Sequence, residues 1–145
     1  MTIAATYTKI VSLVSGTSGI ALCKEELTRQ VSEADLPHAQ VMVGPASWNE
    51  HASGLYRQVR TYTIRTYVRP IAQGVEPDEG YKACLTPLYN LGRTFVANWT
   101  LDDTVDQIGE GDRPIFSDNG VEVLNFDGID HYGFTLTLMV TEKAT

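Results

Sequence analysis

The chain has 145 residues, of which 43% are hydrophobic and 20% are charged, and its formal net charge is −7. This composition is ordinary for a folded soluble protein, and the length predicts one domain over residues 1–145 that needs no disulfide or metal to be stable. The acidic balance argues against general nucleic-acid binding, which requires clustered Lys and Arg to neutralise phosphates.

The two cysteines and the N-terminal segment predict where the protein is kept. Cys23 and Cys84 lack CxxC spacing, so we interpret them as free buried thiols in a reducing compartment. The first 16 residues carry Lys9 as their one positive charge, which is unlike a secretory signal. No run approaches the ~20 apolar residues of a membrane span. We therefore expect a cytoplasmic protein that does not contact membranes.

The first third of the chain predicts one helix and one short strand. Residues 6–15 place Tyr7 and three aliphatic side chains on one helical face, at the i, i+3, i+4, i+7 spacing. Residues 21–33 suit either a helix or a loop. Ala39–Val43 is predicted as a short strand that Gly44-Pro45 closes, and residues 45–54 as an exposed connection.

Residues 56–69, YRQVRTYTIRTYVR, predict a long strand with four of the eleven basic residues. Because side chains of a strand alternate between two faces, we compared its even- and odd-numbered positions. The even positions are more apolar from Tyr62 onward, which predicts that they face the core. Arg57, Arg65 and Arg69 then lie on the opposite, polar face.

The second half of the chain predicts a helix followed by two strands. Pro77-Asp78-Glu79 is a good helix start, because the two acids suit the positive end of the helix dipole. We expect this helix to run to Trp99, with Pro87 kinking it or restarting it with Thr86 as cap. Its predicted buried face comprises Tyr81, Leu85, Leu88, Gly92, Phe95 and Trp99.

Two strands, near 120–126 and over 131–141, close the chain, and the second alternates clearly between apolar and polar residues. The predicted order is α-β-β-α-β-β. This order is typical of an α+β domain in which two main helices pack on a mainly antiparallel four-stranded sheet.

Motifs that carry chemistry are missing from the sequence. The chain has no GxSxG, P-loop, GxGxxG or HExxH pattern. His38, His51 and His131 lie far apart in sequence and lack the spacing of zinc ligands. We therefore predict no catalytic residues, no metal and no cofactor, and a protein that is not an enzyme.

Charge is instead segregated along the chain. Nine of the eighteen acidic residues lie in 102–130, where only Arg113 opposes them, and their spacing does not suit a calcium loop. This segment is either a solvated surface or a surface that meets the arginine strand of a neighbouring copy. The arginine strand, in turn, is a solvated face with internal ion pairs, a subunit contact or a DNA contact.

Head-to-tail contacts between unlike surfaces can close into rings, so we favour the subunit contact. Trp48 either anchors in a partner's pocket or is buried within its own chain. The candidate subunit-interface residues are Arg57, Arg65, Arg69, Asp102, Asp103, Asp106, Glu110, Asp112 and Trp48.

The order and lengths of these elements resemble those of a known family over residues 35–142. Asp35-Leu36-Pro37 leads into the strand Ala39–Val43, and the long strand Tyr56–Val68 precedes the helix that Pro77 begins. The chain closes with a hairpin ending GFTLTLMVTE. This pattern resembles the tail terminator proteins, also called tail-tube capping or tail completion proteins, of long-tailed bacteriophages. It resembles the neck and head-completion adaptor proteins more loosely.

The resemblance implies a structural virion protein that is assembled in the host cytoplasm. It would form a homo-oligomeric ring, of six subunits in this family, that caps the tail tube and joins it to the head. Its partners would be the tail-tube protein and a neck or connector protein, and DNA would pass through the lumen without specific binding. An alternative of another class is a small ligand-binding or enzymatic domain that uses Tyr62, Tyr67 and Arg65 in a cleft between sheet and helix.

Overall fold

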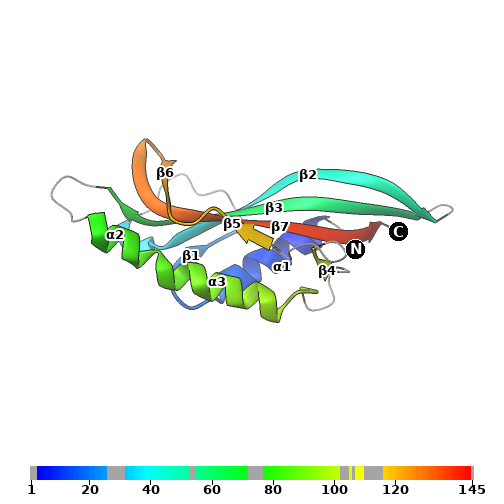
Figure 1. The fold of residues 1–145 in the computed structure, drawn as a ribbon, viewed down its shortest axis with the longest axis horizontal. Helices are drawn as coiled ribbons and strands as arrows, with labels where there is room; N and C mark the ends of the chain where they lie inside the picture. Colours follow the sequence, from blue (N-terminus) through cyan, green and yellow to red (C-terminus); the bar gives the residue numbers. More distant parts are fainter. Residues whose placement is uncertain are drawn as a thin grey trace.

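A computed structural model describes residues 3–25, 32–52, 55–71, 77–101, 105, 107–109 and 116–144. These residues form three α-helices, one short 3-10 helix and seven strands. In chain order they are α1 Ile3–Ser15, β1 Leu22–Cys23, the 3-10 helix Glu33–Asp35, β2 His38–Ala52, β3 Leu55–Pro70, α2 Pro77–Ala83, α3 Leu85–Ala97, β4 Gln107–Ile108, β5 Phe116–Asp118, β6 Glu122–Phe126 and β7 Ile129–Ala144. The three α-helices lie on one face of a curved sheet (Figure 1).

The sheet is built around three long strands, β2, β3 and β7. Its order is β1-β2-β3-β7-β4, and β5 and β6 also pair with β7. The β1–β2 pair is parallel and the other pairs are antiparallel. The predicted α+β class with a mainly antiparallel sheet is therefore confirmed. The predicted four strands in the order α-β-β-α-β-β were wrong in detail, because strands as short as β1, β4 and β5 are too brief to show a two-residue period.

The core lies between the helices and the even-numbered face of β3. Tyr62 and Ile64 are opposite Leu138 and Leu136 of β7, so all four side chains lie on one face, and all are fully buried. Burial of each large apolar side chain contributes about 1.5–3 kcal/mol. The alternation predicted for β3 and β7 is confirmed, and it fixes which face of the sheet meets the helices.

The strand β2 is three times as long as predicted. Residues 45–54 were expected to form an exposed connection, but β2 continues through Gly44-Pro45 to Ala52. A register shift between Val43 and Ala46 absorbs the proline as a bulge, which an edge strand tolerates because its outer side needs no N–H donor. The β2–β3 hairpin therefore projects well beyond the helices (Figure 1).

The N-terminal helix agrees with its prediction. Ile10, Val11 and Val14 are buried, and Tyr7 packs against the core at their side. Gly16 follows the last turn, where its N–H donates to the carbonyl of Ser12 at 3.0 Å. Of residues 21–33, which were left as helix or loop, residues 22–23 form the strand β1, and residues 26–31 lie outside the described part of the chain.

The predicted helix from Pro77 to Trp99 is broken in two, and its buried face was predicted wrongly. The break falls at Cys84, three residues before Pro87, because the proline ring cannot fit against the carbonyl four residues earlier in a continuous helix. The face that meets the core comprises Gly80, Cys84, Pro87, Leu91 and Phe95. Of the predicted face only Phe95 is fully buried, and Tyr81, Leu85 and Trp99 are exposed.

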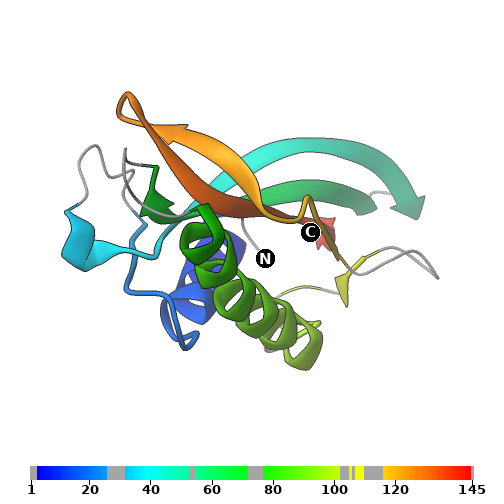
Figure 2. The same cartoon turned by 60° about the vertical axis from the view of Figure 1, so that its left-hand side comes forward.

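A tight turn joins β6 to β7. Asp127 and Gly128 both have positive φ, 53° and 79°, as a two-residue type I′ hairpin turn requires. Asn125 then pairs with Asp130, and Phe126 with Ile129. The predicted turn at Asp127-Gly128 and the strand near 120–126 are confirmed. Figure 2 shows this hairpin curving over the sheet face opposite the helices.

Candidate functional site

The arginines of β3 divide into two groups with different environments. Arg65 is exposed on the sheet face opposite the helices, as predicted. Arg69 is also exposed, but the register shift after Tyr67 pairs it with Tyr132, whose ring lies against Gly80 of α2. Arg69 therefore lies on the helix-bearing face, and its predicted face was wrong, because a bulge shifts the two-residue alternation of a strand. Within the described part of the chain, neither guanidinium has a carboxylate partner. Arg57 is half-buried, and its Nε is buried without a hydrogen-bond partner among the described residues. These guanidinium groups therefore form no ion pair with a residue that the structure describes.

Arg60 has a structural role on the other face of β3. Its Nη1 donates to the carbonyl oxygen of Gly44 at 2.9 Å, and its Nη2 donates to Oε1 of Gln58 at 3.1 Å. Gln58 in turn donates to the buried carboxylate of Glu142, which also accepts from the Thr6 hydroxyl at the start of α1. A carboxylate near a helix N-terminus is favoured by the helix dipole. This network ties the bulge of β2, the middle of the sheet and α1 together.

The acidic half of the predicted interface cannot be placed. Asp102, Asp103, Asp106, Glu110 and Asp112 lie outside the described residues. Trp48, by contrast, lies on β2 and is 53% exposed, so it is not buried within its own chain. It is opposite Gln58 on the helix-bearing face, at the outer edge of the sheet. The alternative that Trp48 is buried within its own chain was therefore wrong, and its contact with a partner stays a prediction.

A stripe of exposed apolar side chains lies on the outer side of α2 and α3. Tyr81, Leu85, Tyr89, Val96 and Trp99 are each about half exposed or more. The sequence missed this surface because α2 and α3 carry two apolar stripes, and we had assigned this one to the core. A helix with two apolar stripes can bury only one of them against the sheet. The second stripe is therefore the sequence feature that indicates an exposed apolar surface.

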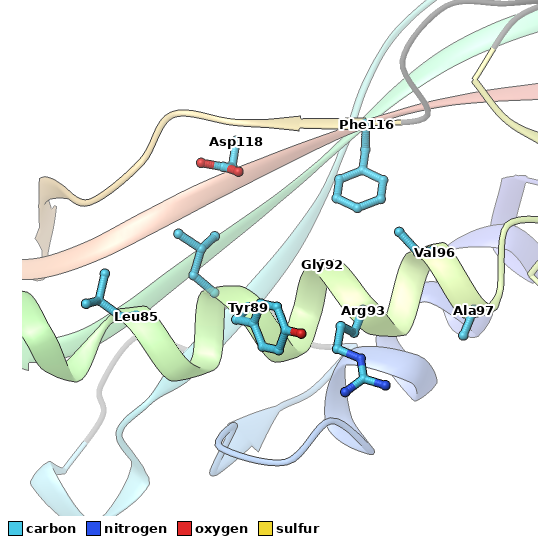
Figure 3. Close-up of a pocket in the computed structure, with 9 residues that line it drawn as sticks. Leu85, Tyr89, Gly92, Arg93, Val96, Ala97, Phe116 and Asp118 are labelled. Carbon is cyan, nitrogen blue, oxygen red and sulfur yellow. The ribbon is translucent and has the colours of Figure 1, made fainter.

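Beside this stripe is a groove of about 600 Å³, which we call the helix groove (Figure 3). The ring of Phe116 points from β5 toward α3, and Gly92 leaves room beneath it. The charged side chains of the groove are Arg93 and Asp118. Its lining is Leu85, Leu88, Tyr89, Gly92, Arg93, Val96, Ala97, Phe116 and Asp118.

The two charges of the helix groove lie on different elements and are each held in place. The Arg93 guanidinium lies 5.9 Å from the centre of the Tyr89 ring, within reach of a cation–π contact. Asp118 accepts a hydrogen bond from the Gly120 N–H at 2.8 Å, which fixes its carboxylate on β5. The groove is thus an apolar trough with one cation on the helix and one anion on the strand.

A cluster of aromatic rings and histidines lies on the opposite face of the sheet, under the β6–β7 hairpin. Tyr67 and Phe126 have ring centres 4.9 Å apart, and His38 and His131 lie beside them. His38 is 1% exposed, and neither ring nitrogen has a hydrogen-bond partner among the described residues. Burial lowers the pKa of His38, which the negative charge of Asp35 partly opposes. Two histidines that are distant in sequence therefore lie against the same two aromatic rings.

Neither a metal site nor the predicted alternative site is found among the described residues. In that part of the chain no three His, Cys, Asp or Glu side chains are grouped so that they could hold a metal ion. The alternative site does not form either, because Tyr62 is buried in the core on one face of β3 while Tyr67 and Arg65 lie on the other. Cys23 and Cys84 are free and buried, as predicted, and burial raises the pKa of each thiol to about 11.

Comparison with known proteins adds no family. No protein-family model matches the chain, and no curated protein matches it. Among the described residues, no helix is long and apolar enough to cross a membrane. The functional argument therefore rests on the surfaces described above.

Proposed function

We propose that this protein is a structural virion protein that forms a ring at the head–tail junction of a long-tailed bacteriophage, where it caps the tail tube and joins it to the head. The observation that carries the proposal is the pair of unsatisfied surfaces on one chain. One is the apolar outer side of α2 and α3, and the other is the projecting β2–β3 hairpin with its exposed Trp48. Exposed apolar surfaces of this kind mark contacts with other proteins.

Charge supports the same proposal. Arg65 and Arg69 project from the sheet without carboxylate partners in the described part of the chain, although the whole protein carries a net charge of −7. An exposed ion pair contributes only about 0–1 kcal/mol, so such arginines serve orientation and specificity more than affinity. A net acidic ring would also let DNA pass through its lumen without gripping the phosphates.

The test is assembly. Native mass spectrometry of the purified protein, alone and with the tail-tube protein of the same phage, should show a ring. Arg65→Glu together with Arg69→Glu should leave the monomer folded and reduce ring formation. Lys24→Glu, compared with the single variant Arg65→Glu, is the matched control, because Lys24 is exposed, lies outside both proposed surfaces and undergoes the same change of charge. A chain that stays monomeric at high concentration with the tube partner present would refute the proposal. Loss of the fold in the arginine variant would instead assign Arg65 and Arg69 to internal packing.

Two alternatives remain. A neck or head-completion adaptor would also form a ring but would contact a different neighbour. The genes that flank this one would distinguish such an adaptor from a tail terminator. A small-molecule site is favoured by the helix groove alone, since about 600 Å³ lies in the usual range for ligand pockets. That alternative predicts that a bound compound occupies the groove of the monomer, with no requirement for self-assembly.

A further inference from the structure

Among the residues that the structure describes, none covers the helix groove. The outer side of a helix that packs on a sheet is normally polar, yet here Tyr89 is 65% exposed and Val96 lies one to two turns further along. Both side chains line the groove together with Phe116 of β5 (Figure 3). An exposed apolar surface does not stabilise a monomer, and such surfaces mark contacts with other molecules. The next question is therefore which molecule covers the groove.

The same chain carries an element that fits this description. Trp48 stands on the outer strand of the hairpin, opposite Gln58, and is 53% exposed. Val43 on the same strand is also an exposed apolar residue. From Val41 onward, the outer edge of β2 has no paired strand among the described residues, so a partner strand or side chain can approach this edge; the Gly44 carbonyl already accepts from Arg60.

We propose that the projecting hairpin of one copy binds the helix groove of a second copy, with Trp48 as the side chain that enters the groove. Charge complementarity selects this occupant. Glu50 is exposed and two residues from Trp48, so it lies on the same face about 7 Å along the strand. In the contact that we propose, Trp48 lies against Phe116, and the hairpin runs in the direction that brings the Glu50 carboxylate toward Arg93 on the helix and keeps it away from Asp118 on β5. The two charges of the groove therefore set the direction of the hairpin.

The geometry of this contact is head-to-tail. Hairpin and groove are different surfaces of one chain, and the hairpin points away from α3, so one copy cannot satisfy both (Figures 1 and 2). A contact between two different surfaces leaves one of each free at the ends, and it closes only as a ring. The inference rests on the proposed function in one respect, which is that the chain self-assembles.

Disulfide trapping tests the contact. Ala46→Cys places a thiol two residues before Trp48 and leaves the tryptophan intact, while Ala97→Cys places one in the helix groove. Ser117→Cys is the matched control, because Ser117 is exposed and neighbours Phe116 on β5 but points to the opposite side of the strand. The native thiols are buried with pKa values of about 11, so they do not compete with the introduced cysteines for disulfide formation. Mixing the Ala46→Cys and Ala97→Cys chains should give a cross-linked dimer at least about tenfold faster than mixing Ala46→Cys with Ser117→Cys.

Two substitutions establish what holds the contact. Trp48→Ala in the Ala46→Cys chain should weaken association by about 30-fold, as expected for the loss of a central aromatic anchor. Arg93→Glu in the Ala97→Cys chain should weaken it by about tenfold, and Glu50→Arg on the hairpin chain should restore most of that loss. Rescue by the reversed pair is a result that misfolding cannot produce.

The outcomes separate this inference from the proposed function. Cross-linking that is no faster than in the Ser117→Cys control, or that Trp48→Ala leaves unchanged, overturns the inference. If native mass spectrometry still shows rings in that case, the proposed function stands and another surface joins the subunits. If a small molecule released on denaturation fills the groove and blocks cross-linking, the groove is a ligand site and the inference fails.

Discussion

Gly80→Ala should destabilise this protein, although alanine is the better helix former. Gly80 lies in α2 against the ring of Tyr132 on β7. A Cβ built at Gly80 would lie 2.8 Å from Cε2 of Tyr132 and closer still to Cδ2. Ordinary contacts between carbon atoms begin near 3.5 Å, so the added methyl group overlaps the ring by at least roughly 0.7 Å.

Two opposing terms decide the size of the effect. Replacing Gly by Ala in a helix gains about 0.8–1.0 kcal/mol. Forcing an extra methyl group into a packed site costs about 1–3 kcal/mol. We therefore expect Gly80→Ala to lower the free energy of unfolding by up to about 2 kcal/mol, measured as a shift of the denaturant midpoint at unchanged m-value.

The sign of the effect should reverse when the obstacle is removed. In a Tyr132→Ala background, Gly80→Ala should raise the free energy of unfolding by up to about 1 kcal/mol, because only the helix-propensity term remains. Gly92→Ala is the control, since its Cβ would meet the Phe116 ring at 3.9 Å, an ordinary contact, and it should stabilise α3. Equal destabilisation by Gly80→Ala in both backgrounds would refute the steric reasoning and point to a backbone requirement.

Two further predictions concern buried titratable groups. Because the pKa of buried His38 is lowered from its ordinary value of 6.5, the unfolded chain binds more protons than the folded one below about pH 6.5. The free energy of unfolding should therefore decline as pH falls from 6.5 to 5, and His38→Phe should flatten this decline; an unchanged slope in that variant would contradict the assignment. Cys23 and Cys84, whose pKa values are raised to about 11, should react with a thiol reagent at pH 7.5 only when the chain unfolds, and their labelling rate should rise with denaturant in step with unfolding. Fast labelling of the native protein at either site would show that the thiols are reachable without unfolding.

Local pattern was enough to predict elements whose two faces differ sharply. The alternation of β3 and β7 placed Tyr62 and Leu138 in the core, and the helical spacing of α1 placed Ile10 there. The turn at Asp127-Gly128 was also readable, because only a few residue types tolerate positive φ. Of the candidate site, the exposure of Arg65 followed from the same alternation.

Elsewhere the local pattern was ambiguous or misleading. The helices α2 and α3 carry apolar residues on two sides, and the choice between Leu91 and Tyr89 as the buried side depends on the sheet beneath them. Gly44-Pro45 is a strand terminator in most contexts, but the neighbouring β3 supplies Arg60 to hold the resulting bulge. The helix groove was missed because the sequence alone does not show which apolar side of α3 is buried.

The sequence by itself determined that this is an α+β chain with an acidic balance and an arginine-bearing strand whose apolar side faces the core. Those properties depend on residues near one another in the chain, or on composition alone. Only the tertiary structure decided that β2 extends into a projecting hairpin with Trp48 exposed, and that His38 and His131 lie against the same aromatic rings. It also decided that none of the described residues covers one apolar side of α3. These features depend on which distant elements pack together, and no local period records that choice.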